Sequence, residues 1–282
     1  MPRQQPYDLE FQPKERRRRD QMLRFLGGFG VIVLLLGVIS VIAVQRDGLL
    51  DDFLSALRPT ESTTEPPEWT YSGSGLFLLC ETDDTGQDLR FCALVRADVT
   101  QRQVHVFPLS PRAMAPHEGG ERSLEQALRA GGPKELKAAA EALIEGTVDR
   151  YIAGGDKGFV TAVNLMGSVT VQVEKSIRYR GAAFTLTLAE GSQRLQGDML
   201  LRYFRYLGTL EEGGTLAQGE LLARVLETYL TKPAGIELLE SRFNSLMNIL
   251  RTDISVSDFY TRRELLLALL ENGGKLTVDV KE

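Results

Sequence analysis

The chain has 282 residues, of which 43% are hydrophobic and 25% are charged, with a formal net charge of −5 at pH 7. This length and hydrophobic content allow a sizeable buried core. The acidic balance argues against a nucleic-acid partner, although it does not identify a substrate because an acidic domain can contain a locally basic pocket. The only histidines, His105 and His117, are not at zinc-ligand spacing from each other or from the two cysteines.

The most distinctive local feature is an uncharged run of twenty apolar and small residues, 25–44. At about 1.5 Å of helical rise per residue, it matches the roughly 30 Å hydrocarbon core of a bilayer. A fully buried soluble helix is the alternative, but such helices rarely stay apolar over this length. Because the run is longer than the core of a cleaved signal peptide, we predict a transmembrane signal anchor.

The charges that flank this run predict its orientation. Residues 1–24 contain seven basic and four acidic residues, whereas the chain beyond the run has more acidic than basic residues. Basic flanks usually stay in the cytoplasm, so we expect a single-pass protein of the cell membrane with a cytoplasmic N-terminus and a large extracytoplasmic C-terminal domain. The arginines at 16–19 are better explained by this topology, or by anionic lipids, than by nucleic-acid binding.

Residues 45–75 are predicted to connect the anchor to the folded domain. Apolar residues at helical spacing indicate a short helix over 47–57. Residues 58–75 are rich in Pro, Ser, Thr, Glu and Gly, which is typical of a stalk. We therefore expect the extracytoplasmic domain to occupy residues 76–282.

Strands and helices are predicted to alternate along this domain. Apolar runs predict strands over 76–80, 91–97 and 104–109, with the second and third forming a hairpin. Two helical pieces follow over 123–144, broken at the Gly-Gly-Pro sequence 131–133. An extended stretch from Tyr151, a helix over 156–166 and a strand over 169–173 complete a pattern that predicts an α/β or mixed α+β domain.

The C-terminal part is predicted to contain two amphipathic helices within 219–250 and an edge strand over 275–280.

Cys80 and Cys92 lie near the facing ends of the first two predicted strands. A disulfide between them is permitted outside the cytoplasm, but their register is not determined at this point, so the thiol state stays open. The sequence contains no nucleophile elbow, P-loop or HExxH motif.

Several segments follow one another in a distinctive order: LFLLCETDD, FCALVRADVTQRQVHVFPLSPRA, GGPKEL before a helix, DKGFVTAVNLMGSVTVQV and LAEGSQRLQGDMLLRYFRYL. Their order and spacing resemble the LytR-CpsA-Psr family of Gram-positive cell envelopes, and LRTDISVSDFY resembles a late helical segment of that family. The resemblance implies an α/β/α sandwich with a central mixed sheet. It also implies binding of a polyprenyl pyrophosphate and Mg²⁺, and transfer of a glycopolymer such as teichoic acid from its lipid carrier to peptidoglycan.

The resemblance assigns roles to individual residues. Asp83 corresponds to a magnesium ligand, Arg112 and Arg205 to catalytic and substrate-binding arginines, and Gln218 to a substrate-binding glutamine. The sequence departs from the family pattern nearby, because Ala113 follows Arg112 where the family has Asp, and Leu207 replaces the second arginine after Arg205.

The Arg-Ser-Asp sequence of the family aligns with Asp88-Leu89-Arg90, in which the charges are reversed. Residues two apart on a strand share a face, so Asp88 is a candidate for a second magnesium carboxylate beside Asp83, and Arg90 for substrate binding. The alternative is that Asp88 and Arg90 form a solvated surface pair.

Arg112 and Arg205 are present, whereas two arginine positions of the family pattern are lost, which favours binding over catalysis. Losing two charge-assisted contacts, at about 1.5 to 3 kcal/mol each, weakens pyrophosphate binding by roughly two to four orders of magnitude. We therefore expect a protein of envelope assembly that binds a polyprenyl-phosphate-linked glycan, or another envelope protein, with reduced or no catalysis. An active magnesium-dependent phosphotransferase is the alternative, and the predicted topology places the domain on the wrong side of the membrane to regulate transcription.

Overall fold

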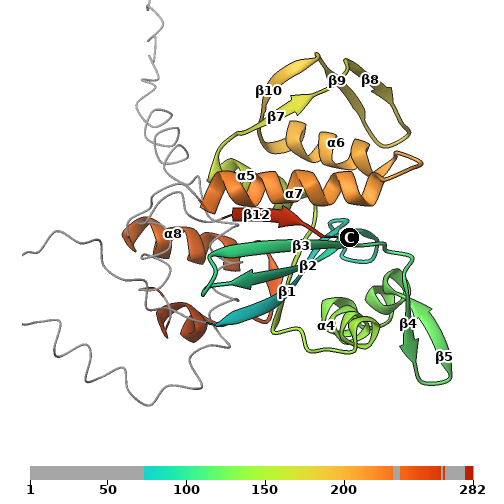
Figure 1. Cartoon of the computed structure of the whole chain (residues 1–282), viewed down its shortest axis with the longest axis vertical. Coiled ribbons are helices and arrows are strands. Elements are labelled where there is room, and N and C mark those ends of the chain that lie inside the picture. Colours follow the sequence, from blue (N-terminus) through green and yellow to red (C-terminus); the bar gives the residue numbers. More distant parts are fainter. Residues whose placement is uncertain (1–72, 231–235, 262, 264–276, 282) are drawn as a thin grey trace, which may run out of the picture.

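The computed structural model describes residues 73–230, 236–261, 263 and 277–281 (Figure 1). The predicted cytoplasmic tail, the transmembrane anchor at 25–44 and nearly all of the predicted stalk lie outside these residues. Within the described ranges, no helix is long and apolar enough to cross a membrane.

A six-stranded mixed sheet forms the centre of the domain, in the order β11-β6-β1-β2-β3-β12. Its bounds are β1 Ser74–Thr82, β2 Leu89–Asp98, β3 Gln103–Leu109, β6 Arg150–Gly154, β11 Arg251–Thr252 and β12 Thr277–Val280. β2 pairs antiparallel with both β1 and β3, which confirms the predicted hairpin, whereas β6 runs parallel to β1 and β12 parallel to β3. The central mixed sheet of the predicted fold class is thereby confirmed.

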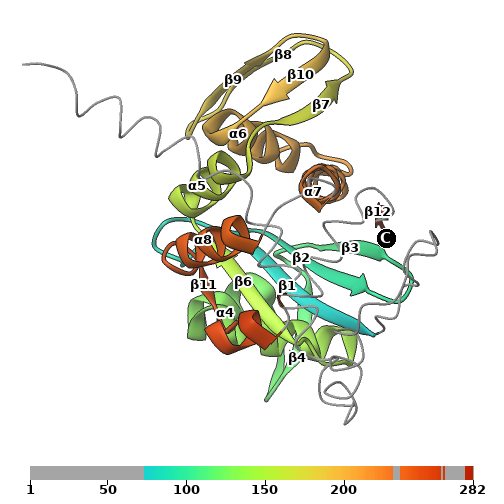
Figure 2. The same ribbon diagram turned by 90° about the vertical axis from the view of Figure 1, so that its left-hand side faces the viewer.

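Helices cover both faces of this sheet, as Figure 2 shows. Helix α4 (Leu124–Ile144) packs on one face and contacts β2 and β6. Helices α5 (Asp156–Met166) and α7 (Gly214–Leu230) pack on the other face, where α8 (Ile236–Met247) contacts α5. Each face has its own hydrophobic core, because residues on a strand alternate between the two sides of the sheet.

Further strands lie outside the main sheet. Of these, only β7 (Val169–Val173) was predicted from the sequence. β7 pairs with β10 (Gly191–Leu195), and β8 (Ile177–Arg180) pairs with β9 (Thr185–Leu188). Helix α6 (Gly197–Gly208) lies between these ribbons and the rest of the domain (Figure 1). A hairpin of β4 (Met114–His117) and β5 (Gly120–Ser123) leads into α4.

Local sequence signals explain several element boundaries. Ser123 begins α4 with a capping box, in which its hydroxyl accepts a hydrogen bond from Gln126 N and the Gln126 side chain accepts one from Ser123 N. The predicted break in this helix is confirmed by non-helical backbone at Gly131 and Gly132, where Gly132 has φ +71°. The predicted bounds of α5 and β7 match those of the structure.

The two cysteines lie directly opposite each other on β1 and β2, because the antiparallel register pairs Cys80 with Cys92. Both are buried and both are free thiols. Burial is the main cause that raises the pKa of the Cys80 thiol, and the neighbouring Cys92 adds to this effect.

Candidate functional site

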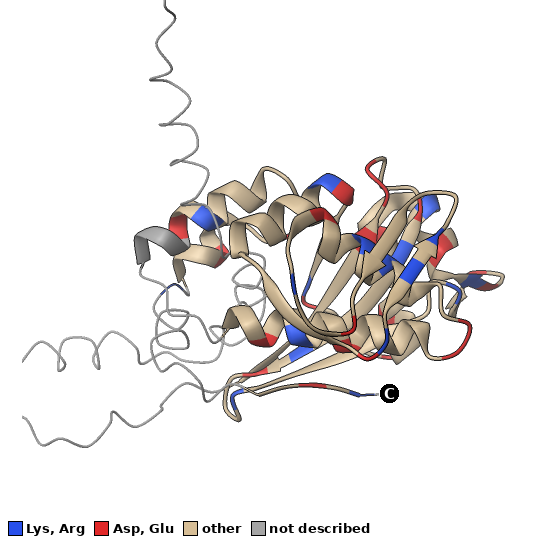
Figure 3. Ribbon diagram, turned by 90° about the horizontal axis from the view of Figure 1, so that it is seen from above, with Lys and Arg blue, Asp and Glu red and all other residues tan. Residues whose placement is uncertain are grey.

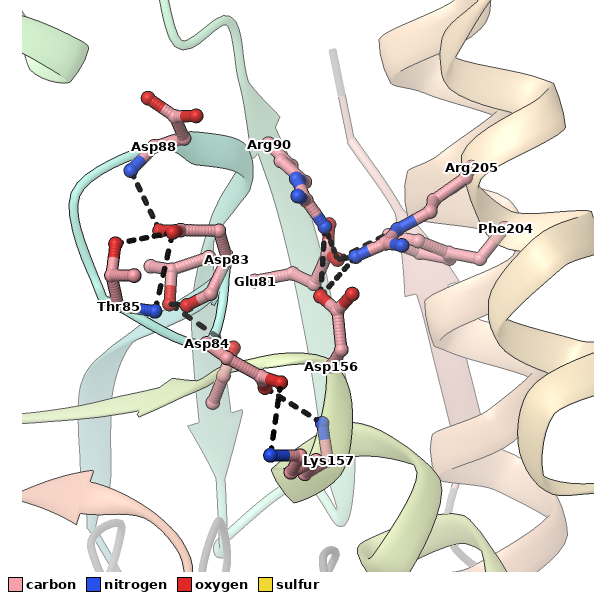
Figure 4. Close-up of polar contacts among 12 residues, drawn as sticks. Glu81, Asp83, Asp84, Thr85, Asp88, Arg90, Asp156, Lys157, Phe204 and Arg205 are labelled. Carbon is pink, nitrogen blue, oxygen red and sulfur yellow. Dashed lines mark hydrogen bonds and ion pairs between the residues drawn. The ribbon is translucent and has the colours of Figure 1, made fainter. Parts of the chain in front are cut away.

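Four charged side chains from four separate elements converge at one end of the central sheet (Figure 4). Glu81 comes from β1, Arg90 from β2, Asp156 from the first turn of α5 and Arg205 from α6. We call these four residues the charge cluster.

Each arginine of the cluster contacts both acids. Arg205 donates to Glu81 Oε1 from Nε at 3.1 Å and from Nη2 at 2.7 Å, and its Nη2 also donates to Asp156 Oδ1. Arg90 Nη1 donates to the same Asp156 oxygen at 2.7 Å and lies 3.8 Å from Glu81 Oε1. Two guanidinium groups are therefore held side by side by two carboxyl groups.

A β-bulge directs Arg90 toward this cluster. Glu81 pairs with Phe91 and Thr82 pairs with Leu89, so Arg90 is an extra residue of β2 with no partner in the ladder. Such bulges reorient a side chain relative to the regular alternation of a strand. As a result, Arg90 faces Glu81 and Asp156 while its neighbour Phe91 remains in the core.

Burial raises the pKa values of both acids of the cluster. Glu81 is only 4% exposed, and this burial raises its pKa to about 8, even though Arg90 acts in the opposite direction. Its Oε2 atom is buried and has no hydrogen-bond partner among the described residues. Burial also raises the pKa of Asp156, again against the effect of Arg90.

The loop after β1 holds a third acid in a different role. Asp83 Oδ1 accepts hydrogen bonds from the backbone N–H groups of Gln87 and Asp88 at 2.8 and 2.9 Å, and Oδ2 accepts from the backbone N–H and the hydroxyl of Thr85. These hydrogen bonds, the one from the Asp88 backbone foremost, hold the pKa of Asp83 well below its usual range. The carboxylate of Asp83 therefore organises the turn that leads into β2.

The structure separates the two predicted magnesium ligands. The backbone of Asp88 contacts Asp83, but the Asp88 carboxylate is 60% exposed and lies 3.1 Å from Arg129 Nη2. Across the described ranges, no group of three or more His, Cys, Asp or Glu side chains is arranged to hold a metal ion. The carboxylates do not fit a magnesium site in this arrangement, and a role for Mg²⁺ stays a prediction.

The other predicted site residues are divided by the fold. Arg90 and Arg205 lie together in the charge cluster. Arg112 is exposed between β3 and β4, and its side chain forms no ion pair within the described part of the chain. Gln218 on α7 is buried and donates to the carbonyl oxygen of Phe204 at 3.1 Å, so it joins α7 to α6 rather than facing the cluster.

An apolar cavity of about 120 Å³ adjoins the charge cluster. Glu81 belongs to its lining and thereby connects the cavity to the two arginines. The remaining lining is almost entirely hydrophobic and comes from β1, β2, β6, α5, α6 and α7, together with Leu250; it includes Phe91, Phe159, Phe204, Val163, Met166 and Leu226. The aromatic ring centroids of Phe91 and Phe204 are 4.9 Å apart in an edge-to-face arrangement.

The combination of a cavity and adjacent guanidinium groups suits an amphiphilic anion. Guanidinium N–H groups match the geometry of phosphate oxygens, and an apolar cavity accepts a hydrocarbon group. Elsewhere, basic and acidic residues are interspersed along the ribbon of the described elements, as Figure 3 shows. The fold and site thus define an α/β protein with two guanidinium groups, paired with two carboxyl groups, beside an apolar cavity.

Comparison with known proteins identifies the family. The model of the LytR_cpsA_psr family matches residues 99–274, more than half of the chain, and the chain therefore belongs to this family. No match is found among curated protein sequences.

Solved structures share the fold at low sequence identity. A protein from Eubacterium siraeum, named as a transcription regulator, has a TM-score of 0.65 and 15% identity over 79% of this chain and 89% of its own. TagV of B. subtilis has a TM-score of 0.60 and 13% identity, and the match covers 76% of this chain and 86% of TagV. TagT, in a structure with bound LIIa-WTA, has a TM-score of 0.56 and 16% identity, and the match covers 78% of this chain and 82% of TagT.

Sequence reasoning did not identify Glu81 and Asp156 as site residues. Within the sequence Glu-Thr-Asp-Asp at 81–84, the resemblance points to Asp83, whereas Glu81 is the acid that reaches the arginines in the structure. The available signal was the position of Asp156 at the start of a predicted helix, beside the partial positive charge of its N-terminus. That signal alone did not connect Asp156 to residues of distant elements.

Proposed function

We propose that this chain is a membrane-anchored, extracytoplasmic protein of cell-envelope assembly that binds a polyprenyl-phosphate-linked glycopolymer precursor, with reduced or no catalysis. The observation that carries the proposal is the pair of guanidinium groups, Arg90 and Arg205, beside an apolar cavity. Family membership supports a role in this process, and the ligand of TagT, LIIa-WTA, supports a glycopolymer of the teichoic acid type.

Both arginines have donors available for a phosphate. A guanidinium carries five N–H donors, and the contacts within the cluster use only some of them. Arg90 is 34% exposed and Arg205 is 17% exposed, so solvent and a head group reach them from outside. A phosphate placed there would accept charge-assisted hydrogen bonds from both side chains.

The size of the cavity limits how a lipid enters. At about 120 Å³ it is smaller than the roughly 300 to 1,000 Å³ of typical small-molecule pockets. A long polyprenyl chain therefore requires α5 or α7, which provide much of the lining, to move away from the sheet. We expect the first isoprenoid units to enter and the rest of the chain to follow only after this movement.

The reduced catalysis in this proposal follows from the partners of the arginines. A phosphate must compete with Glu81 and Asp156 for the same guanidinium groups. Such competition leaves less interaction energy to stabilise charge that develops during phosphoryl transfer. Arg112, the other arginine assigned from the resemblance, has no contact with the cluster that would compensate.

Native mass spectrometry of the full chain in detergent tests the proposal. A polyprenyl pyrophosphate should remain bound to the wild-type protein and to Arg178→Ala, a control on the exposed face of β8. Binding should fall at least about tenfold in Arg205→Ala and in Arg90→Ala, because each loses a charge-assisted contact. Equal binding by all four proteins would refute the assignment of the site.

The alternative, a magnesium-dependent phosphotransferase, is distinguished with the same protein. Incubation with a lipid-linked glycopolymer and a peptidoglycan acceptor should give bound precursor without transfer. Transfer that requires Mg²⁺ and is lost in Arg205→Ala would replace the binding role with catalysis.

A protease assay tests the predicted topology. The chain carries a tag at each end and is treated with external protease in intact cells from which the wall has been removed. Only the C-terminal domain should be digested.

A further inference from the structure

We propose that Arg90 occupies the place of a divalent cation in this site, so that the phosphate head group is bound by guanidinium groups alone and without metal. This inference rests on the proposed function, since it concerns how the same site holds its ligand. Two observations support it: the guanidinium of Arg90 lies between Glu81 and Asp156, and the neighbouring acids have hydrogen-bond or ion-pair partners of their own.

One oxygen of each acid in the charge cluster is engaged by arginines, whereas Glu81 Oε2 is buried without a hydrogen-bond partner among the described residues. Glu81 Oε1 accepts two hydrogen bonds from Arg205, and Asp156 Oδ1 accepts one from Arg90 and one from Arg205. A hard cation such as Mg²⁺ needs oxygen ligands in a near-octahedral arrangement around it. An ion at these oxygens would lie directly beside two guanidinium groups and would be repelled by both.

The acids of the adjoining loop are also engaged. Both oxygens of Asp83 accept hydrogen bonds within the turn. Asp84 accepts from the backbone N–H of Lys157 at 3.0 Å, and its carboxylate lies 3.8 Å from the Lys157 ammonium group. Asp88 pairs with Arg129. Burial raises the pKa of Asp156, and Asp84 and Asp83 lie close enough to the cluster to add to this rise. Hydrogen bonds from the turn and from Lys157 nevertheless hold their carboxylates in the loop.

The backbone explains why Arg90 reaches this position. The bulge at Glu81 and Thr82 leaves Arg90 unpaired in the ladder and directs its guanidinium to Asp156 at 2.7 Å. A guanidinium supplies the positive charge that a cation would bring, and its planar set of donors also binds phosphate oxygens directly. Arg90 thereby pairs with Asp156 and contributes to the anion site.

Binding of Mn²⁺, measured by electron paramagnetic resonance on the full chain in detergent, tests this inference. The wild-type protein should show no saturable binding below about 1 mM. In Arg90→Asp, the guanidinium is removed and a third carboxylate is added beside Glu81 and Asp156, so saturable binding should appear and be at least about tenfold tighter. Arg178→Asp on β8 adds the same acid away from the cluster and should bind as the wild type does.

A second measurement does not depend on folding of the variant. Binding of polyprenyl pyrophosphate by the wild-type protein should change less than about twofold between EDTA and excess Mg²⁺. Saturable Mn²⁺ binding by the wild-type protein that disappears in Asp156→Asn, or loss of lipid binding in EDTA, would overturn the inference. If no lipid binds under either condition, the proposed function fails, while the Mn²⁺ titration still decides whether the site holds a cation.

Discussion

Replacement of Glu81 by glutamine tests whether this buried carboxyl group controls the pH dependence of stability. Glutamine has nearly the same size and keeps an oxygen that accepts hydrogen bonds from Arg205, but it does not titrate. The Glu81→Gln variant therefore resembles the wild-type protein with Glu81 protonated. A difference in pH dependence between the two proteins reports on the proton of this residue.

The expected magnitude follows from the folded and ordinary pKa values, about 8 and 4.5. Because the folded protein holds this proton more tightly than the unfolded chain, the resulting stabilisation is complete below pH 4.5 and is lost as the pH rises to about 8. At about 1.4 kcal/mol per pKa unit, the upper limit of this loss is about 5 kcal/mol. We expect roughly 2 to 3 kcal/mol, since Arg90 and Arg205 can approach the ionised carboxylate more closely.

Urea unfolding followed by far-ultraviolet circular dichroism at pH 5 to 9 gives the required free energies of unfolding. The difference in stability between Glu81→Gln and the wild type should move in favour of the variant by roughly 2 to 3 kcal/mol from pH 5 to pH 9. A difference that stays constant over this range would show that Glu81 has an ordinary pKa. The explanation based on burial in the charge cluster would then be refuted.

Three further predictions concern packing and the thiols. Phe204→Ala should lower the free energy of unfolding by about 3 to 5 kcal/mol, measured in urea, because this side chain is buried against the cavity. Gly155→Ala should cost about 1 to 3 kcal/mol in the same assay, since its new Cβ would lie 2.9 Å from the Cα atom of Asp84; unchanged stability would contradict this close approach. Cys80 and Cys92 should resist alkylation in the native protein and both react after unfolding without reductant, as judged by mass; failure to react would indicate a disulfide instead.

Much of the fold could be predicted because it depends on local patterns. The helix over 156–166 and the strand over 169–173 follow from hydrophobic periodicity, and the break at Gly131 and Gly132 follows from residues that permit non-helical backbone. The ribbon of β8 and β9 was not predicted because each strand has only four residues, too few for its alternating pattern to be distinguished from a loop. Short strands of this kind are stabilised by their packing, which is not local information.

The residues of the candidate site were harder to predict from the sequence than the elements of the fold. Arg90 and Arg205 were both predicted to bind substrate, from their positions relative to the family pattern, and they lie together in the structure. The reasoning that grouped Asp88 with Arg90 assumed regular alternation along the strand. In the structure Asp88 lies before β2 begins and pairs with Arg129, and the bulge leaves Arg90 unpaired in the ladder, so the two side chains do not share a strand face.

The sequence by itself therefore determined the types of the longer elements with clear periodicity, the family resemblance and the two arginines, because these are contained in residue identity and spacing. Only the tertiary structure decided which acids meet those arginines. Glu81 and Arg205 are 124 residues apart in the chain, and their contact depends on the packing of α6 against α5 and α7. Such a contact follows from the register of β1 with β2 and from the position of two helices, none of which is contained in any local pattern.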